Sequence, residues 1–451
     1  MLILFNLLLS SAFLENVLKK ISVKNKKKEI FQCPALDPTA SSENVLLSEN
    51  DYQEFTDKNV YGCRQTYLSK GIKLNNCILR IYNCNFKNSN SDRNAIYFRS
   101  EAVSKQLTGN IEIQNCNFSN YYSNFGGSLF IYSRDASRKI TISYCQFDSD
   151  PKQQSEKGGS IYINAISVII KNSHFNNCQS QLGGAIYYEN ENKDYNKQEN
   201  SDDYALKIKQ CTFINNKAKF KGGSVYLSTQ KCNSNGPIEI KNCNFTSSTT
   251  TEARGKGAGI FISSKETKRE FNIIECLFGR CLSNKGSAVY FNAVSGNIKK
   301  CIFANNEAEE GDAIYYQYGS TTINQGEKLT ITNNIFGKTF SSKKILSECL
   351  IFVSFNPNAK IEYADNQVKI DSSLEKVEII KSPEGKSLSK GQIKVFEEGS
   401  KLISKQMFIS EATAPNCPKP DGYEIITQNK YDSTPSKLYA CKQSFTEKLE
   451  I

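Results

Sequence analysis

Residues 206–227 read LKIKQCTFINNKAKFKGGSVYL, and much of the chain repeats this arrangement. A short alternating segment leads into Cys-x-Phe, an Asn-containing turn follows, and two glycines introduce a second apolar segment that contains Tyr. The element recurs every 25 to 38 residues, which is typical of a repeat array. Seven copies keep both marker residues (Cys84 and Phe86, Cys116 and Phe118, Cys145 and Phe147, Cys211 and Phe213, Cys243 and Phe245, Cys276 and Phe278, Cys301 and Phe303), and two copies keep only the aromatic, Phe175 and Phe336.

The segment before each cysteine alternates between apolar and polar residues, as in Ile238, Glu239 and Ile240 ahead of Cys243. This period of two predicts a half-buried β-strand, and helical spacing is not sustained anywhere in residues 80–340. The alternation slips by one residue just before the cysteine, so we expect a bend there. Asn occupies that position or lies near it at Asn83, Asn115, Asn172, Asn242 and Asn333, and Asn tolerates the left-handed conformation of a tight corner.

Paired glycines precede the second strand of several repeats. Such pairs predict a positive φ and close stacking of neighbouring turns. A phosphate-binding loop is excluded, because the pairs recur in strand context without a following Lys-Ser/Thr and helix. The clearest structural glycines are Gly126, Gly127, Gly158, Gly159, Gly183, Gly184, Gly222 and Gly223.

Short strands joined by tight corners at this period predict an all-β fold, a single-stranded parallel β-helix of about ten coils. Equivalent residues then stack, so the Phe of each Cys-x-Phe would form an internal aromatic ladder, with the cysteines on the same inward face. We interpret these cysteines as buried thiols that pack as small apolar groups. Disulfides are the alternative, expected among Cys33, Cys63, Cys178 and Cys281 and above all between Cys417 and Cys441.

The repeats suggest four segments of the 451-residue chain. Residues 1–12 (MLILFNLLLSSA) are typical of a signal peptide, although a buried strand or helix is the alternative. Residues 13–80 would form a lead-in and N-terminal cap, 81–370 the β-helix, and 371–451 a C-terminal cap or small cysteine-containing module. No other apolar run reaches eighteen residues, so we expect no integral membrane segment.

The amino-acid composition limits the kinds of partner and cofactor that the chain is expected to bind. The net charge of +11 is spread along the chain, which suggests tolerance of acidic glycans but does not indicate a nucleic-acid partner. One histidine and no paired C-x-x-C leave little from which to build a zinc site, and we expect no cofactor, metal or catalytic residue. Two N-glycosylation sequons begin at Asn117 and Asn244, each at the middle position of Cys-x-Phe, which should face outward.

Residues of about 80–340 resemble the polymorphic outer-membrane protein repeats of chlamydiae, in a version found on protist surfaces. Gly183 to Ile186 match the Gly-Gly-Ala-Ile motif, and Phe213 to Asn216 match the Phe-x-x-Asn motif, as do Phe303 to Asn306. The resemblance implies a right-handed β-helix, extracellular or at a cell surface, in an adhesin-like role.

Three functions remain open at this level. The first is a non-catalytic adhesin-like protein whose loops bind host or matrix glycans or proteins. The second is a polysaccharide lyase or glycoside hydrolase, which requires convergent carboxylates or a basic residue over the substrate. The third is a purely structural surface coat. The only histidine, His174, is interpreted as a corner or packing residue, and the acidic residues of 307–312 are interpreted as a solvated turn.

Overall fold

The computed structural model describes the chain in pieces between residues 44 and 440. Among the described residues all regular structure is β-strand, and no helix there is long and apolar enough to cross a membrane. The described ranges are 44–46, 53–56, 59–63, 67–68, 72–75, 78–87, 93–100, 110–134, 138–149, 154–165, 167–190, 204–229, 236–264, 269–318, 328–338, 349–354, 361–370, 378–381, 393–396, 424–428 and 437–440.

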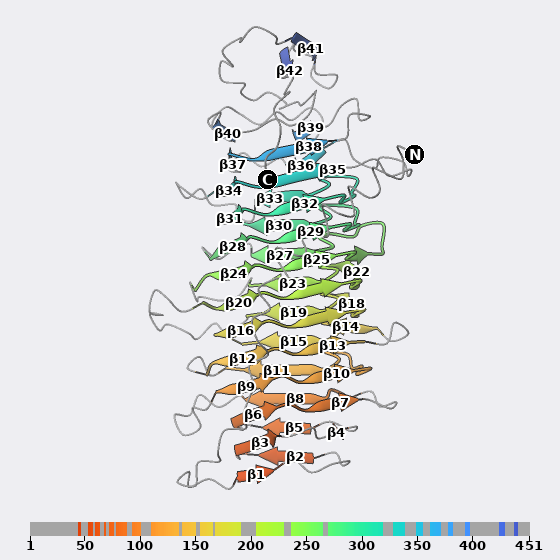
Figure 1. Cartoon of the computed structure of the whole chain (residues 1–451), viewed down its shortest axis with the longest axis vertical. Helices are drawn as coiled ribbons and strands as arrows, with labels where there is room; N and C mark the ends of the chain where they lie inside the picture. The colour runs from red at the N-terminus through yellow and green to blue at the C-terminus, as the bar shows by residue number, and fades with distance from the viewer. Residues whose placement is uncertain are drawn as a thin grey trace, which may run out of the picture. The chain divides into compact units, whose positions relative to one another are not determined.

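Three long parallel sheets run side by side (Figure 1). Sheet A has 13 strands: β1 (Asn44–Leu46), β3 (Asn59–Cys63), β6 (Ile78–Tyr82), β9 (Ile111–Gln114), β12 (Ile140–Ser143), β16 (Val168–Lys171), β20 (Leu206–Lys209), β24 (Ile238–Lys241), β28 (Glu270–Ile274), β31 (Ser295–Lys299), β34 (Leu329–Thr332), β37 (Ile361–Ala364) and β40 (Ile393–Phe396). Sheet B has 12 strands: β2 (Gln53–Thr56), β5 (Ile72–Asn75), β8 (Ile96–Ser100), β11 (Leu129–Ser133), β15 (Ile161–Asn164), β19 (Ile186–Glu189), β23 (Val225–Ser228), β27 (Ile260–Ser264), β30 (Val289–Ala293), β33 (Ile314–Tyr318), β36 (Cys349–Val353) and β39 (Glu378–Lys381).

Sheet C carries the Cys-x-Phe elements in 11 strands: β4 (Tyr67–Leu68), β7 (Asn85–Lys87), β10 (Asn117–Ser119), β13 (Gln146–Asp148), β17 (His174–Asn176), β21 (Thr212–Ile214), β25 (Asn244–Thr246), β29 (Leu277–Gly279), β32 (Ile302–Ala304), β35 (Ile335–Lys338) and β38 (Gln367–Ile370). A short sheet D, not expected from the sequence, holds β14 (Ser155–Lys157), β18 (Gln179–Leu182), β22 (Lys217–Lys221) and β26 (Thr249–Thr250). Each coil passes from sheet A through sheet C to sheet B, so the prediction of a parallel β-helix is confirmed.

The sheets extend further toward both ends than the expected range 81–370 and the expected ten coils. Strands β1 to β5 precede that range and β6 begins before it, while β39 and β40 follow it in sheets B and A. Within 371–451 the strands β41 (Glu424–Gln428) and β42 (Lys437–Ala440) pair antiparallel. The signal-peptide segment and the cysteines of the expected Cys417–Cys441 disulfide lie outside the described residues.

The corners use the left-handed backbone that the Asn positions predicted. Asn83, Asn115, Asn172, Asn242 and Asn333 all have φ between 51° and 57°. A second left-handed corner, which the sequence analysis did not assign, follows two residues after each Phe in several coils. Its members include Asn120, Asn177, Asn215, Ser247, Arg280 and Asn305, and these two corners place sheet C between its neighbours.

The two glycines of each pair have different roles. The first takes a positive φ, as at Gly183 with φ +66°. The second allows coils to approach, since a Cβ on Gly184 would lie 1.9 Å from the carbonyl oxygen of Gly223. Both predicted roles are therefore confirmed, one at each position.

The internal aromatic ladder is present. Nine phenylalanines, Phe86 to Phe336, stack with ring centroids 4.6 to 5.1 Å apart and ring planes within 10° of parallel. Every ring is at most 2% exposed. Offset-parallel stacking at this separation adds to the hydrophobic stabilisation of each buried ring.

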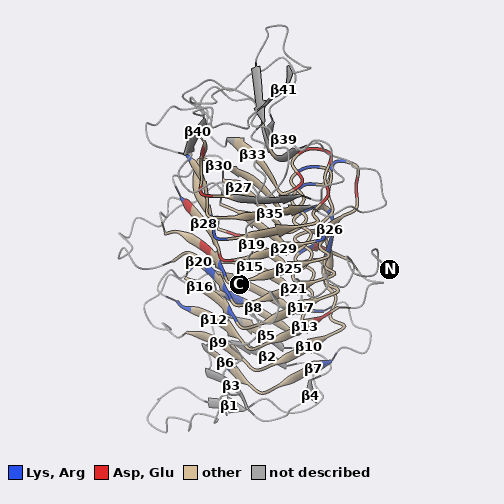
Figure 2. Cartoon of the chain, turned by 45° about the horizontal axis from the view of Figure 1, so that its top comes forward, with Lys and Arg blue, Asp and Glu red and all other residues tan. Residues whose placement is uncertain are grey.

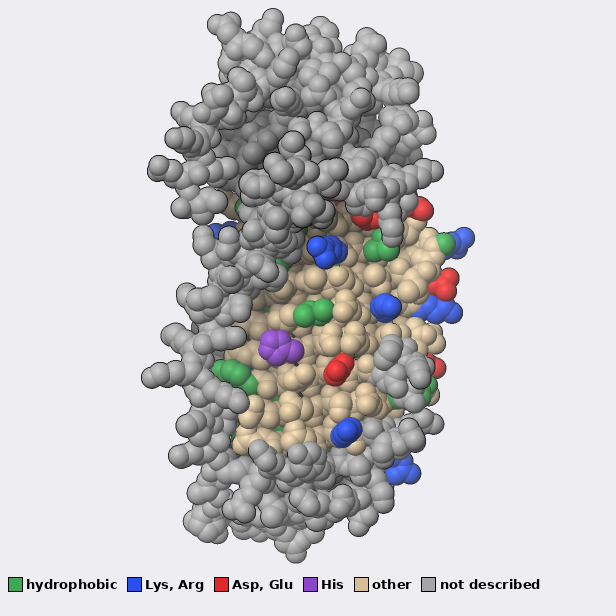
Figure 3. Space-filling model, turned by 45° about the vertical axis from the view of Figure 1, so that its right-hand side comes forward, with side chains coloured by type: hydrophobic (Ala, Val, Ile, Leu, Met, Phe, Trp, Pro, Cys, Tyr) green, Lys and Arg blue, Asp and Glu red, His purple; other side chains and the backbone are tan. Residues whose placement is uncertain are grey.

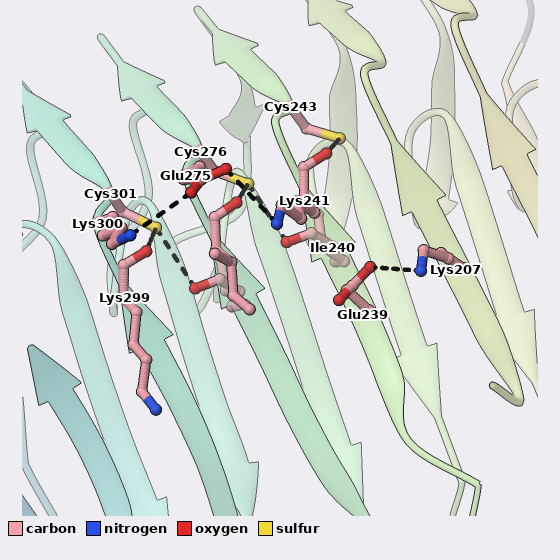
Figure 4. Close-up of polar contacts among 12 residues, drawn as sticks. Lys207, Glu239, Ile240, Lys241, Cys243, Glu275, Cys276, Lys299, Lys300 and Cys301 are labelled. Carbon is pink, nitrogen blue, oxygen red and sulfur yellow. Dashed lines mark hydrogen bonds and ion pairs between the residues drawn. The ribbon is translucent and has the colours of Figure 1, made fainter. Parts of the chain in front are cut away.

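The cysteines beside this ladder are buried free thiols, as predicted. Each donates to the carbonyl oxygen two residues earlier, and those from Cys116 to Cys301 also donate to one on the preceding coil: Cys276 Sγ lies 3.3 Å from Ile274 O and 3.5 Å from Ile240 O (Figure 4). Ser173 and Asn334 occupy the same column and also donate to carbonyls. The column therefore suits small hydrogen-bonding side chains at a corner, and Cys meets that need.

The expected disulfides of Cys178 and Cys281 are wrong. Both are buried free thiols at the position three residues after the Phe. Two coils, carrying Asn216 and Ser248, separate them in that column, which corresponds to roughly 14 Å at the usual strand spacing. Cys178 Sγ instead lies 2.9 Å from the hydroxyl of Ser160.

Candidate functional site

A second aromatic column lies on the outer face of sheet B. Eight rings stack in succession with centroids 4.5 to 5.6 Å apart: Tyr97, Phe130, Tyr162, Tyr187, Tyr226, Phe261, Tyr290 and Tyr315. The sequence analysis noted the tyrosine of the second strand but assigned it no column. The signal was available, because an aromatic residue recurs between two apolar residues, where strand parity points it outward.

A row of residues covers most of this outer column. Each of them lies just before the positive-φ glycine of its coil, and they pair in parallel from one coil to the next. The four lysines of this row, Lys157, Lys221, Lys256 and Lys285, lie over the ring of the next coil. Lys157 Nζ is 4.8 Å from the Tyr187 ring centroid, and Lys285 Nζ is 5.2 Å from that of Tyr315. The rings from Tyr162 to Tyr315 are consequently no more than 9% exposed.

The column opens at its N-terminal end. There the half-exposed rings of Tyr97 and Phe130 stack 4.5 Å apart, 5° from parallel, and Phe130 continues onto Tyr162 at 5.0 Å. They form part of a pocket of about 740 Å³. Its walls come from Asn94, Tyr97, Arg99, Tyr122, Ser123, Asn124, Phe125, Phe130, Tyr132, Arg134 and Tyr162.

Hydrogen bonds fix one wall of the pocket. The amide Nδ2 of Asn94 donates to Ser123 Oγ at 2.9 Å and to the carbonyl oxygen of Phe125 at 2.8 Å. Ser123 Oγ also donates to Phe125 O at 2.8 Å. Phe125 meets Tyr162 edge to face at 5.5 Å, so the turn that carries Phe125 is held against the outer column.

Two arginines frame the opposite side. Arg134 Nε donates to Tyr132 Oη at 2.8 Å, and the guanidinium carbon of Arg99 lies 5.4 Å from the Tyr132 ring centroid. Both arginines are exposed. Guanidinium groups offer several fixed N–H donors, which suit hydroxyl and carboxylate oxygens of a ligand.

The lining has aromatic rings, amides and guanidinium groups, but no Asp, Glu, His or Cys. Because Phe130 is stacked between Tyr97 and Tyr162, these rings turn their edges to the pocket, and the apolar edges can pack against the C–H groups of a sugar ring. An apolar platform with a few placed polar groups is the usual composition of a small-ligand site. Within the described residues, no group of three or more His, Cys, Asp or Glu could hold a metal ion.

The glycosylation candidates occupy different environments. Asn117 is exposed on β10, and its Nδ2 donates to Asn85 Oδ1 at 2.7 Å. Asn244 has the same outward register on β25 but is only 8% exposed, and its Oδ1 accepts a bond from Thr246. The expectation that both Asn side chains are displayed therefore holds for Asn117 alone.

The interpretations of His174 and of the acidic turn change with the structure. His174 is exposed in the outward register of sheet C rather than packed, and it is the purple side chain in Figure 3. In the turn, Asp312 is 2% exposed, with Oδ1 accepting from Ala308 N at 2.9 Å. Glu310 pairs with Lys285 of the preceding coil at 2.8 Å. The turn is therefore bonded into the stack rather than simply solvated.

Comparisons with known proteins give a fold likeness only. No family model matches the chain, and no curated protein matches its sequence. Among solved structures it is similar to a mutant tailspike protein of E. coli bacteriophage HK620 in complex with a pentasaccharide, at 12% identity and TM-score 0.40, over 76% of this chain and 62% of that one. Another mutant of that tailspike, also with pentasaccharide, gives 10% identity and TM-score 0.33, over 82% of this chain and 59% of that one.

The chain thus spans about three fifths of the length of those tailspike chains. What this chain binds has to be argued from its own side chains.

Proposed function

We propose that this chain is an adhesin-like β-helix, secreted or held at a cell surface, that binds glycans without catalysis. The observation that carries the proposal is the open end of the outer aromatic column, where the half-exposed, stacked rings of Tyr97 and Phe130 line a pocket together with Arg99 and Arg134. We therefore locate the proposed binding region at this pocket rather than on the loops to which the adhesin-like interpretation of the sequence assigned it.

A glycan array probed with the full chain tests this proposal. Phe130→Ala removes one of the two half-exposed aromatic rings, and we expect affinity for the bound oligosaccharides to fall about 10- to 30-fold, the range for a central aromatic contact. Phe220→Ala is the matched control, because Phe220 is 37% exposed and does not line the pocket. Equal affinities of the two variants, or no glycan retained by the unmodified chain, would refute the proposal. The latter result would favour a structural coat.

An enzymatic alternative is less well supported in this pocket. Glycoside hydrolysis by paired carboxylates needs two Asp or Glu residues flanking the bond, and the lining contains neither. A lyase could use Tyr132 as a base, since Arg134 donates to its oxygen. Incubation with polyuronates, followed by ultraviolet absorbance for unsaturated products, distinguishes a lyase from a non-catalytic glycan-binding protein. Product formation that Tyr132→Phe abolishes would establish the lyase.

A further inference from the structure

The outer face of sheet A carries a column of three lysines. Lys171, Lys209 and Lys241 are the last residues of β16, β20 and β24 and are direct register partners. At the usual strand spacing their Cα atoms are roughly 4.8 Å apart. Figure 2 shows basic residues gathered around β16 and β20. We refer to these three residues as the lysine stripe.

Like charges in direct register repel each other, so the lysine stripe works against stability. Elsewhere on the same face the coils alternate charge: Lys207 Nζ lies 3.0 Å from Glu239 Oε1 of the next coil (Figure 4). Lys241 forms an ion pair with Glu275 at 3.7 Å. Neither Lys171 nor Lys209 forms an ion pair with a described residue, since the neighbouring Glu239 pairs with Lys207.

Each lysine of the stripe is followed by a corner that leads into sheet C. The first outward-facing residues of sheet C after this corner are polar and uncharged. Three residues after each lysine, sheet C presents His174, Thr212 and Asn244 in register. The three lysines are half-buried, so their stems lie along the sheet while the amines reach solvent. The corner therefore combines a row of cations with neutral hydrogen-bonding groups.

We propose that the lysine stripe binds an anionic polysaccharide, a polymer whose carboxylate or sulfate groups recur along its length. Binding neutralises a repulsion that the fold alone leaves in place. Nucleic acid fits less well, because neither the stripe nor the three register partners His174, Thr212 and Asn244 include a Phe, Tyr or Trp on which successive bases could stack. The stripe lies on another sheet from the aromatic pocket and is independent of the function proposed there.

The test compares two triple variants of the full chain that lose the same charge. The first is Lys171→Gln with Lys209→Gln and Lys241→Gln. The control, Lys219→Gln with Lys285→Gln and Lys328→Gln, removes lysines that are paired with Glu252, Glu310 and Glu362. Heparin is the anionic probe, uncharged dextran is the negative control, and affinity is measured over a range of salt concentrations.

We expect the stripe variant to lose on the order of 10- to 100-fold in heparin affinity, and its plot of log affinity against log salt to flatten by about two to three units. Its thermal midpoint should stay level or rise, because the repulsion is gone. The control should keep most of its affinity. Equal losses in both variants, or unchanged binding in the stripe variant, would overturn the proposal.

Two further outcomes are decisive. Tighter binding of single-stranded DNA than of heparin at the same salt concentration would overturn the choice of polysaccharide. Phe130→Ala should leave heparin affinity intact, so a failure of the pocket and a failure of the stripe remain distinguishable. A fall in heparin affinity with Phe130→Ala would contradict the independence of the two sites.

Discussion

Replacing one glycine of a stacked pair by alanine should damage the solenoid out of proportion to the size of a methyl group. A Cβ on Gly184 would lie 1.9 Å from Gly223 O and 2.5 Å from Lys217 O, both rigid backbone atoms. Because real Cβ contacts shorter than 3.0 Å are essentially never seen, the two coils would have to separate by about 1 Å.

That separation would destabilise the folded state through two effects. Overpacking costs about 1–3 kcal/mol. Lengthening the bonds Gly184 N to Gly222 O and Ala185 N to Ser224 O, both 2.9 Å, costs about 1 kcal/mol each. We therefore expect Gly184→Ala to lower the free energy of unfolding by about 3–5 kcal/mol.

The matched control is Gly279→Ala in β29, where the nearest atom to an added Cβ is Ala304 O at 4.0 Å. This change should be neutral or stabilise the protein by about 0.4–1 kcal/mol through the unfolded chain. Urea unfolding followed by circular dichroism compares the two, with hydrogen exchange at β19 and β23 as a local check. Equal unfolding midpoints would refute the close-stacking argument.

Further expectations concern the core and corners. Phe213→Ala should lower the free energy of unfolding, measured by urea titration, by about 3–5 kcal/mol. The control Thr212→Ala, at an outward-facing position, should lower it by less than about 0.5 kcal/mol. Asn242 has a left-handed backbone with φ 54°, which Ala adopts less readily than Asn or Gly. Asn242→Ala should therefore lower the free energy of unfolding by about 1–2 kcal/mol, and Asn242→Gly by less than half of that, in the same titration. Burial raises the pKa of Cys178 and Cys281 to about 12, so both should resist a thiol reagent until the chain unfolds, and labelling of the folded protein would contradict their burial.

Cys178 and Cys281 illustrate how a high cysteine count can mislead. Sixteen cysteines in a chain with an apolar start suggest disulfides, and the sequence analysis kept that alternative for Cys178 and Cys281. Their burial as free thiols, bonded to Ser160 in one case, makes them packing and corner residues. Asn216 and Ser248, which lie between them in the same column, are also small hydrogen-bonding residues and show which property the position requires.

The candidate site was predicted least well, for a physical reason. Tyr97 and Phe130 are ordinary members of an eight-ring column in sequence, and nothing local marks them as open. They differ from Tyr187 and Tyr315 because lysines of the preceding coil cover those rings. That cover depends on which residue precedes the glycine pair one coil away, and therefore on the register between coils.

The repeat by itself determined the main strands of each coil, the inward phenylalanines and the left-handed corner before each Cys-x-Phe, because each depends on a period of two or on the φ preference of a single residue. Only the stacking of coils decided which residues of different coils are neighbours. It places Tyr97 beside Phe130 and Lys171 beside Lys209, and it separates Cys178 from Cys281 by two coils. Residues about thirty positions apart become neighbours at strand spacing, and no local pattern states which coil falls on which.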